Sequence, residues 1–354
     1  MKVAIVTDAW HPQTNGVVTT LSRTVECLTS LGHAVTLMTP EGLPSIPCPT
    51  YPEIRLALFQ GRRVAQWLED ERPDALHIAT EGPLGLAARN AACRANFAFT
   101  TSYHTQFPQY LQARFPVPPR FSYAVLRRFH GRATRTMVGT QQVRDDLRNR
   151  GFNHLVHWGR GVDTELFKPR LGVRDAYPGP VLVYVGRVAV EKSVEDFCRV
   201  RTGGTKIVIG AGPALQDLRR RYPEVIFTGY KYGSELAELM SCGDCFVFPS
   251  RTDTFGLVML EAMASGLPVA AYPVIGPIDV VREGFSGCLR NDLTEAVSAA
   301  LKLDPQHARQ QALEYRWENA TRQFLGNLVE LRHPVAQRRQ ARRCFSARLA
   351  RLFD

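Results

Sequence analysis

The sequence has no apolar run long enough to cross a bilayer. A membrane-spanning helix needs about 20 consecutive, mostly apolar residues, and no segment of the 354 residues offers them. The first ten residues, MKVAIVTDAW, contain one lysine and an apolar run of only four residues. That pattern is typical of a first β-strand rather than of a signal peptide. We therefore expect the protein to stay in the cytoplasm.

Metal-binding patterns are also scarce. Cys242 and Cys245 form a C-x-x-C, but no second pair and no histidine accompany them. The eight cysteines are scattered, several of them in apolar runs, where a thiol packs as a small hydrophobic group. No Asp-x-Asp occurs in the chain. We expect no metal, no disulfide and no cofactor.

Acidic residues are too few to balance the basic ones, which leaves a formal charge of +11. Residues 332–354 contain seven arginines against one aspartate, and Phe345, Leu349, Leu352 and Phe353 follow helical spacing. This basic amphipathic tail could lie on an anionic lipid surface. A second basic and aromatic segment spans residues 110–135. Solvated basic surface and a disordered end remain the alternative, and no nucleic-acid-binding module accompanies the charge.

The chain length and the hydrophobic pattern predict two α/β domains. Apolar runs at residues 3–6, 34–38, 75–78, 97–101 and 136–138 alternate with helical stretches, and the same rhythm returns at 181–185, 206–209, 225–228, 245–248 and 269–271. Such alternation is typical of doubly wound parallel sheets. We place the domains at 1–165 and 170–305, with a hinge between them and the tail after residue 331.

Residues 249–266, PSRTDTFGLVMLEAMASG, suggest an anion site. A short apolar strand precedes this segment, and helical spacing from Gly256 to Gly266 follows a polar loop. The free amides of residues 255–257 and the helix dipole would favour a phosphate. Asp253 and Glu261 stand eight positions apart around this turn. An ordinary strand-to-helix crossover with solvated acids is the alternative.

With these motifs the chain resembles the family 4 glycosyltransferases, retaining enzymes of GT-B fold whose signature is a Glu, seven residues, then a second Glu. Asp253 replaces the first Glu, and Thr254, Phe255 and Gly256 follow it as in the family. The resemblance extends to about residue 331. It implies two facing Rossmann-like domains with an interdomain cleft, and a terminal helix at about 306–331 that packs back on the first domain.

The resemblance also implies which residues form the site. HPQTNGVVTT, YVGR with EK, SYHT, and GYKYG match family segments near the donor, the transferred sugar and the nucleobase. Expected catalytic residues are His104, Asp253, Arg187 and Lys192. Expected donor-binding residues are Asn15, Gly16, Gly186, Arg187, Lys192, Gly229, Tyr230, Lys231, Thr254, Phe255, Gly256, Leu257 and Glu261.

The expected reaction moves a hexose with retention from a nucleoside diphosphate sugar to an acceptor. Arg187 and Lys192 would neutralise the diphosphate without a metal. The resemblance favours UDP-glucose or UDP-glucuronate as donor and a membrane lipid, diacylglycerol first, as acceptor. The protein would then bind the inner face of the cell membrane through residues 110–135 and the tail. Alternatives are a GDP-mannose-dependent α-mannosyltransferase acting on a phosphatidylinositol-type lipid or a glycan, a sugar-nucleotide epimerase, and a nucleic-acid-binding scaffold.

Overall fold

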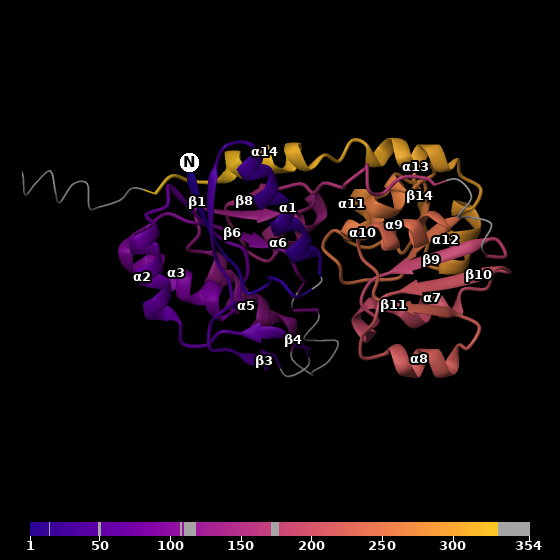
Figure 1. The fold of residues 1–354 in the computed structure, drawn as a ribbon, viewed down its shortest axis with the longest axis horizontal. Helices are drawn as coiled ribbons and strands as arrows, with labels where there is room; N and C mark the ends of the chain where they lie inside the picture. Colours follow the sequence, from indigo (N-terminus) through magenta and orange to yellow (C-terminus); the bar gives the residue numbers. More distant parts are fainter. Residues whose placement is uncertain (14, 49–50, 107, 110–117, 171–176, 332–354) are drawn as a thin grey trace, which may run out of the picture.

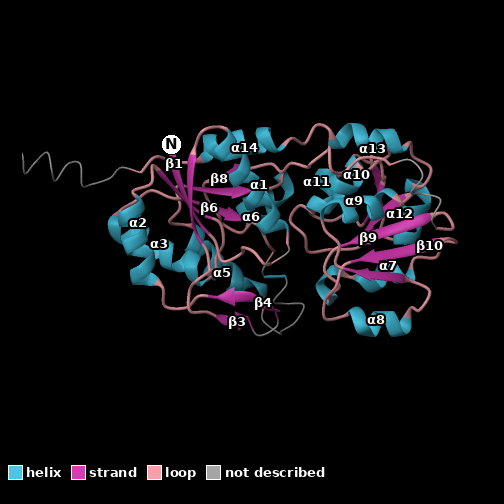
Figure 2. Ribbon diagram, viewed as in Figure 1, coloured by secondary structure: helices cyan, strands magenta, loops and turns pink. Residues whose placement is uncertain are grey.

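The computed structural model consists of two α/β units that lie side by side (Figure 1). It describes the chain except for residues 14, 49–50, 107, 110–117, 171–176 and 332–354. The predicted tail and part of the basic segment at 110–135 therefore lie outside the described residues. Each unit contains a parallel sheet with helices around it (Figure 2), which confirms the predicted fold class.

The first sheet has six parallel strands in the order β2-β1-β5-β6-β7-β8. The strands are β1 (Lys2–Val6), β2 (Ala34–Met38), β5 (Ala75–Ile78), β6 (Thr100–Tyr103), β7 (Arg135–Val138) and β8 (Leu155–His157). A separate antiparallel hairpin joins β3 (Ile46–Cys48) and β4 (Tyr51–Leu56). Neither this hairpin nor β8 was predicted from the sequence.

Helices cover both faces of the first sheet. They are α1 (Gly16–Ser30), α2 (Gly61–Glu71), α3 (Pro83–Ala95), α5 (Pro119–His130) and α6 (Gln141–Asn149). Successive side chains of a strand point to opposite faces. Val3 and Ile5 of β1 accordingly pack with α1, whereas Ala4 and Val6 pack with α2 and α3. Burial on both faces explains why these strands are uninterrupted apolar runs.

The second sheet has the strand order β11-β10-β9-β12-β13-β14, again all parallel. Its strands are β9 (Val181–Val185), β10 (Thr205–Ile209), β11 (Ile226–Gly229), β12 (Cys245–Phe248), β13 (Val269–Ala271) and β14 (Gly287–Leu289). Its helices are the 3-10 turn η2 (Val190–Lys192), α7 (Val194–Arg199), α8 (Leu215–Arg221), α9 (Gly233–Ser241), α10 (Leu257–Ala264), α11 (Pro277–Val280), α12 (Leu293–Ala300) and α13 (Pro305–Ala312).

The C-terminal return differs from the single helix predicted at about 306–331. The structure has two helices there, and α13 packs with the second unit while α14 (Trp317–Asn327) lies on the first (Figure 1). The segment between them must run beside the hinge, where the Val162 amide donates to the Tyr315 carbonyl at 3.2 Å. A continuous helix could not make that contact. After α14, the Leu331 amide donates to the Asp74 carbonyl at 2.8 Å, which ties the chain to the first unit.

Candidate active site

Both sheets have a topological switch point. In the second sheet β10 lies on one side of β9 and β12 on the other, so the connections after β9 and β12 diverge. β1 occupies the same position between β2 and β5 in the first sheet. Ligands of doubly wound sheets bind at the carboxyl ends of strands beside such a point. The loops after β9 and β12 are therefore the first place to look for a site.

A lysine and an aspartate from these two loops form an ion pair. The ammonium of Lys192, at the end of η2, donates to Oδ1 of Asp253, which follows β12, at 2.5 Å. The two side chains are only 20% and 19% exposed. The other carboxylate oxygen of Asp253 is buried and has no hydrogen-bond partner in the described part of the chain. The pair thus leaves one strong acceptor available to a ligand.

Glycines let the loop after β9 approach its neighbours closely. Gly186 has φ +152°, and a Cβ there would lie 2.8 Å from the Tyr184 hydroxyl oxygen. A Cβ on Gly210, after β10, would lie 1.9 Å from the Gly186 carbonyl oxygen. Only glycine fits such an approach of two backbones. The next residue, Arg187, is partly buried, and its carbonyl accepts from the Tyr184 hydroxyl at 2.9 Å.

The start of α10 is shaped by Gly256, which precedes its first turn. Gly256 has φ +80°, and a Cβ there would lie 2.8 Å from Met259 Cε and 2.9 Å from Phe248 Cζ. No side chain caps α10, so its first amides remain available in the way anion sites require. Burial raises the pKa of Glu261, one turn into α10, to about 7, while the charge of Arg23 on α1 acts to lower it.

The two units meet at this same loop. The Thr254 hydroxyl donates to the carbonyl of His104, the first residue after β6, at 2.6 Å. The side-chain amide of Gln106 donates to the Asp253 carbonyl at 3.3 Å. A Cβ on Gly16 would lie 3.5 Å from Leu257 Cδ1. Predicted site residues from both units, which are far apart in sequence, therefore gather around the loop at 253–257.

His104 packs against a buried arginine that the sequence analysis did not identify. Nη2 of Arg160 lies 3.2 Å from His104 Nδ1, and Arg160 is 6% exposed. Burial and then the Arg160 charge hold the pKa of His104 well below its usual range. The one signal available in the sequence was the position of Arg160 in RGVDTELFKP, the segment at the boundary between the two predicted domains.

Two predicted donor-binding side chains have local partners. Asn15 Oδ1 accepts from the Val17 and Val18 amides at 3.0 and 3.1 Å, so this side chain caps α1. The Asn15 side chain therefore stabilises the start of α1, and Gly16 is the residue of this loop that approaches Leu257. The Lys231 ammonium pairs with Glu235 one turn further along α9.

The predicted nucleobase segment lies beside the glycine contacts. The Gly210 amide donates to the Gly229 carbonyl at 2.8 Å, which brings the end of β11 next to the loops after β9 and β10. The exposed rings of Tyr230 and Tyr232 stack with their centroids 6.1 Å apart. Gly186 and Gly229 are thus connected through Gly210, and these aromatic rings border the same edge of the sheet.

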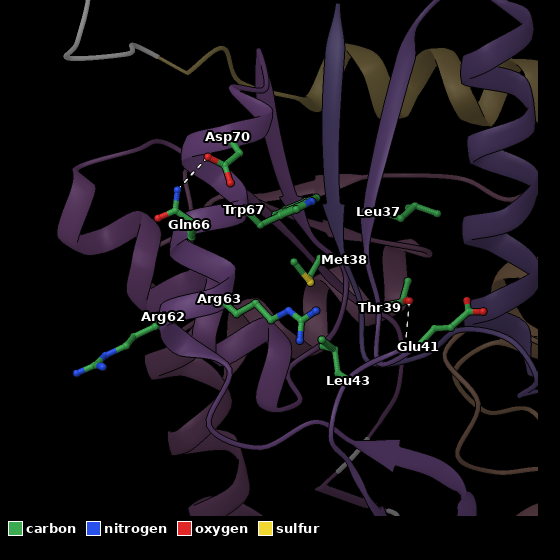
Figure 3. Close-up of a pocket in the computed structure, with 10 residues that line it drawn as sticks. All are labelled: Leu37, Met38, Thr39, Glu41, Leu43, Arg62, Arg63, Gln66, Trp67 and Asp70. Atoms are coloured by element: carbon green, nitrogen blue, oxygen red, sulfur yellow. Dashed lines mark hydrogen bonds between the residues drawn. The ribbon is translucent and has the colours of Figure 1, made fainter.

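A pocket of about 640 Å³ lies between β2 and α2 (Figure 3), and none of its lining residues belongs to the loop at 253–257. Leu37 and Met38 of β2 form one side, and Trp67 and Arg63 of α2 point into it from the other. None of its lining residues was predicted as functional. The pocket lacks the switch-point position and the charge pairing found at the loop of Asp253.

Comparisons with known proteins match both units of the chain. A family model described as Glycosyltransferase Family 4 matches residues 14–166, and one described as Glycosyl transferases group 1 matches residues 179–303. A GDP-mannose-dependent alpha-mannosyltransferase of Mycolicibacterium smegmatis is 30% identical, with 82% of this chain and 84% of the relative covered. The corresponding enzyme of Corynebacterium glutamicum is 29% identical, with 94% and 89% covered.

A plant relative and two solved structures extend the comparison. The sulfoquinovosyl transferase SQD2 of Arabidopsis thaliana is 31% identical, with 79% of this chain and 61% of the relative covered. Among solved structures, sucrose-phosphate synthase from Thermosynechococcus elongatus superposes with a TM-score of 0.72 at 18% identity, covering 98% and 99% of the two chains. HepE of Anabaena, solved in complex with UDP-glucose, gives 0.69 at 17% identity and 92% and 98% coverage. These structural matches concern the fold.

Proposed function

Because the chain belongs to the family 4 glycosyltransferases of GT-B fold and uses a nucleotide sugar, we propose that it moves a hexose from UDP-glucose or UDP-glucuronate to a membrane lipid, with diacylglycerol as the first candidate. The observation that carries this proposal is the Lys192–Asp253 pair at the switch point, with one Asp253 oxygen unsatisfied. The Lys192 ammonium would bind a phosphate of the donor, and the Asp253 oxygen that has no partner in the described part of the chain would accept a hydrogen bond from a hydroxyl of the sugar.

The donor diphosphate would bind between Arg187, Lys192 and the first amides of α10. Arg187 offers a planar set of donors and Lys192 a compact charge. Both would stabilise the negative charge that the leaving diphosphate gathers in the transition state. Because Arg187, Lys192 and the start of α10 would supply the positive charge, we propose that the reaction is metal-independent.

Sugar and nucleoside would be held on either side of the diphosphate. Asp253 would accept from hexose hydroxyls, and Glu261, on the far side of the first α10 turn, from the ribose. His104 would lie against the transferred hexose. The acceptor hydroxyl would attack from the face that the diphosphate leaves, and a phosphate oxygen would take its proton. That path retains the anomeric configuration and requires no nucleophile from the protein.

The surface of α5 supports a lipid acceptor. Tyr123, Leu126 and Phe129 of α5 face the core, while Phe121 and Val125 are 56% and 69% exposed. Exposed arginines flank these two apolar residues, namely Arg120, Arg127 and Arg128. Apolar residues surrounded by basic ones suit the surface of an anionic bilayer. We propose peripheral binding to the cytoplasmic membrane face through α5, with the tail at 332–354 as a second contact.

Some of the relatives support a lipid acceptor, and others support a different sugar donor. Relatives named sulfoquinovosyl transferase and alpha-monoglucosyldiacylglycerol synthase, the latter 24% identical in Streptococcus pneumoniae with 92% of this chain and 83% of the relative covered, favour a glycolipid product. The two GDP-mannose-dependent relatives favour the second candidate, an α-mannosyltransferase acting on a phosphatidylinositol-type lipid or a glycan.

Labelled donors offered with and without vesicles test the proposal. The full chain would be incubated with UDP-glucose, UDP-glucuronate or GDP-mannose, in the presence of EDTA, with vesicles containing diacylglycerol or phosphatidylinositol. We expect label from a UDP-sugar in the diacylglycerol lipid, with the α-anomer identified by NMR. Label only from GDP-mannose would favour the second candidate. An absolute requirement for added Mg²⁺ or Mn²⁺ would contradict the metal-independent mechanism.

A further inference from the structure

The contacts of Arg160 determine which nitrogen of the His104 ring carries the proton. Nη1 of Arg160 donates to the carbonyls of Trp158 and Gly159 at 2.6 and 3.0 Å, and the guanidinium lies 4.6 Å from the centroid of the Trp158 ring. These contacts hold the side chain in place and direct Nη2 at His104 Nδ1, 3.2 Å away. A guanidinium has donors but no acceptor. Nδ1 must therefore be the unprotonated nitrogen, and the ring proton must be on Nε2.

The other ring nitrogen has no partner. His104 Nε2 is buried and makes no hydrogen bond within the described part of the chain. Buried polar groups are almost always satisfied, so such an N–H points to a group that arrives with a ligand. The backbone of His104 is fixed to the donor loop, because its carbonyl accepts from the Thr254 hydroxyl at 2.6 Å. The unsatisfied N–H is therefore anchored beside the loop of Asp253.

We propose that Arg160 is a positioning residue that keeps His104 as the neutral tautomer with its proton on Nε2, aimed at an oxygen of the transferred hexose. This inference rests on the proposed function for the identity of the ligand. The tautomer itself does not depend on the substrate. Arg160 has no contact with the reacting atoms in this scheme and acts only through His104.

The charges around the ring also favour its neutral form. Burial and then the charge of Arg160 disfavour a second proton on the ring, and His77 of β5 and His130 of α5 would add to this effect if protonated. The carboxylate of Asp253, whose neighbour Thr254 binds the His104 carbonyl, is engaged by Lys192, and Glu81 is paired with His130. Burial lowers the pKa of Arg160 only to about 10, so the guanidinium stays charged at neutral pH. His104 thus donates a hydrogen bond without carrying a charge that would compete with the departing diphosphate.

Nitrogen-15 NMR of the full chain with labelled histidine tests the tautomer directly. The spectrum of H104Q identifies the His104 signals. We expect wild-type signals of a neutral ring protonated on Nε2 throughout pH 5.5–8. In R160M the pKa of His104 should rise, because the Arg160 charge, the largest cause after burial, is removed, and both tautomers should be populated. A wild-type ring protonated on Nδ1, or one that titrates near pH 6.5, would overturn the proposal.

A variant of Arg309 is the control that distinguishes an effect of Arg160 on the His104 ring from a general loss of packing. Arg309 is also partly buried and donates to three carbonyls, those of Ala264, Phe167 and Thr164, at 2.6, 2.7 and 3.0 Å. R309M should lower the thermal midpoint yet leave the His104 signals unchanged. If R309M shifts them as R160M does, the effect of Arg160 is only structural and the proposal fails. R160K, which keeps the charge, is the second variant should R160M not fold.

An activity measurement links the tautomer to the reaction. With whichever donor proves active, kcat of R160M should fall at least tenfold at pH 7.5, while KM for the donor changes less. Its kcat should also fall further toward acidic pH, where the ring now protonates, and R160K should recover part of the loss. An R160M profile parallel to that of the wild type would overturn the assignment. The NMR result remains interpretable even if the proposed donors are wrong.

Discussion

At the residue scale, Asp253 and Glu261 are assigned different parts of one donor, so their variants should differ. D253A should lower kcat at least tenfold, which corresponds to the loss of about 1.4 kcal/mol of transition-state stabilisation. E261A should mainly weaken binding of the nucleotide. Steady-state kinetics together with calorimetric titration of UDP distinguish the two effects. D217A, which removes an exposed acid on α8, is the control, and wild-type kinetics in both site variants would refute the assignment.

The raised pKa of Glu261 predicts a pH dependence. The pKa is about 7 in the folded protein and 4.5 for an ordinary glutamate. An ionised carboxylate accepts hydrogen bonds from two ribose hydroxyls, so UDP should bind more tightly as pH rises from 6 to 8. The folded state holds the extra proton between pH 4.5 and 7, so the free energy of unfolding should fall as pH rises through that window.

E261Q removes both effects and serves as the baseline, because UDP itself titrates equally in the two experiments. Calorimetry at pH 6, 7 and 8 should show a steeper gain in UDP affinity for the wild type than for E261Q. Urea unfolding at pH 8 should show E261Q to be the more stable protein, since a buried charge has been removed. Parallel pH profiles for the two proteins would indicate that Glu261 does not titrate in this range.

At the element scale, the conformation of the turn before α10 requires glycine at position 256. G256A forces a side chain into the left-handed region and against Met259 and Phe248, which should cost roughly 1–3 kcal/mol and displace the phosphate-binding amides. G326A, in α14 with open space around its Cβ, should be neutral or stabilising by up to about 1 kcal/mol. Urea unfolding and UDP titration compare them. Equal behaviour of the two variants would exclude a special role for the turn.

The sequence predicted long buried elements better than short edge elements. β9 and β12 were predicted with the correct bounds because both faces of each strand are apolar. β8 and β14 have three residues each and lie at sheet edges, where little apolar patterning is needed. The resemblance to family 4 glycosyltransferases predicted that the loops after β9 and β12 contribute to one site. It could not identify Arg160, because a single arginine has no periodic signal and its partner is 56 positions away.

The exposed face of α5 predicts which substitutions should weaken the proposed membrane binding. Replacing Phe121 and Val125 together with serine should weaken co-sedimentation with anionic vesicles, and R120Q combined with R128Q should weaken it most at low salt. Activity on a vesicle-borne acceptor should fall in parallel while UDP binding stays unchanged. L313S alters an exposed leucine outside α5 and is the control. If both double variants sediment as the wild type does, the lipid surface is bound elsewhere.

At the scale of the whole molecule, the two units touch through residues of the proposed site. The helix α14 and the hinge connect the units, and two hydrogen bonds also join them, from Thr254 to the His104 carbonyl and from Gln106 to the Asp253 carbonyl. Closure of the two units onto each other would therefore complete the proposed site, because neither unit alone contains both His104 and the loop at 253–257. None of the helices in the described part of the chain is long and apolar enough to cross a bilayer.

The hydrogen bond from Thr254 to the His104 carbonyl predicts the energetics of that closure. T254V keeps the shape of the side chain but loses this bond, which is worth about 1 kcal/mol and should shift the equilibrium toward open forms roughly fivefold. T252V is a matched control, because the Thr252 hydroxyl donates to the Glu191 carbonyl at 3.1 Å within the second unit. We expect T254V to show a larger radius of gyration in X-ray scattering without donor, and a lower kcat. T254S should restore both, and an identical response of T252V and T254V would show that the contact does not control closure.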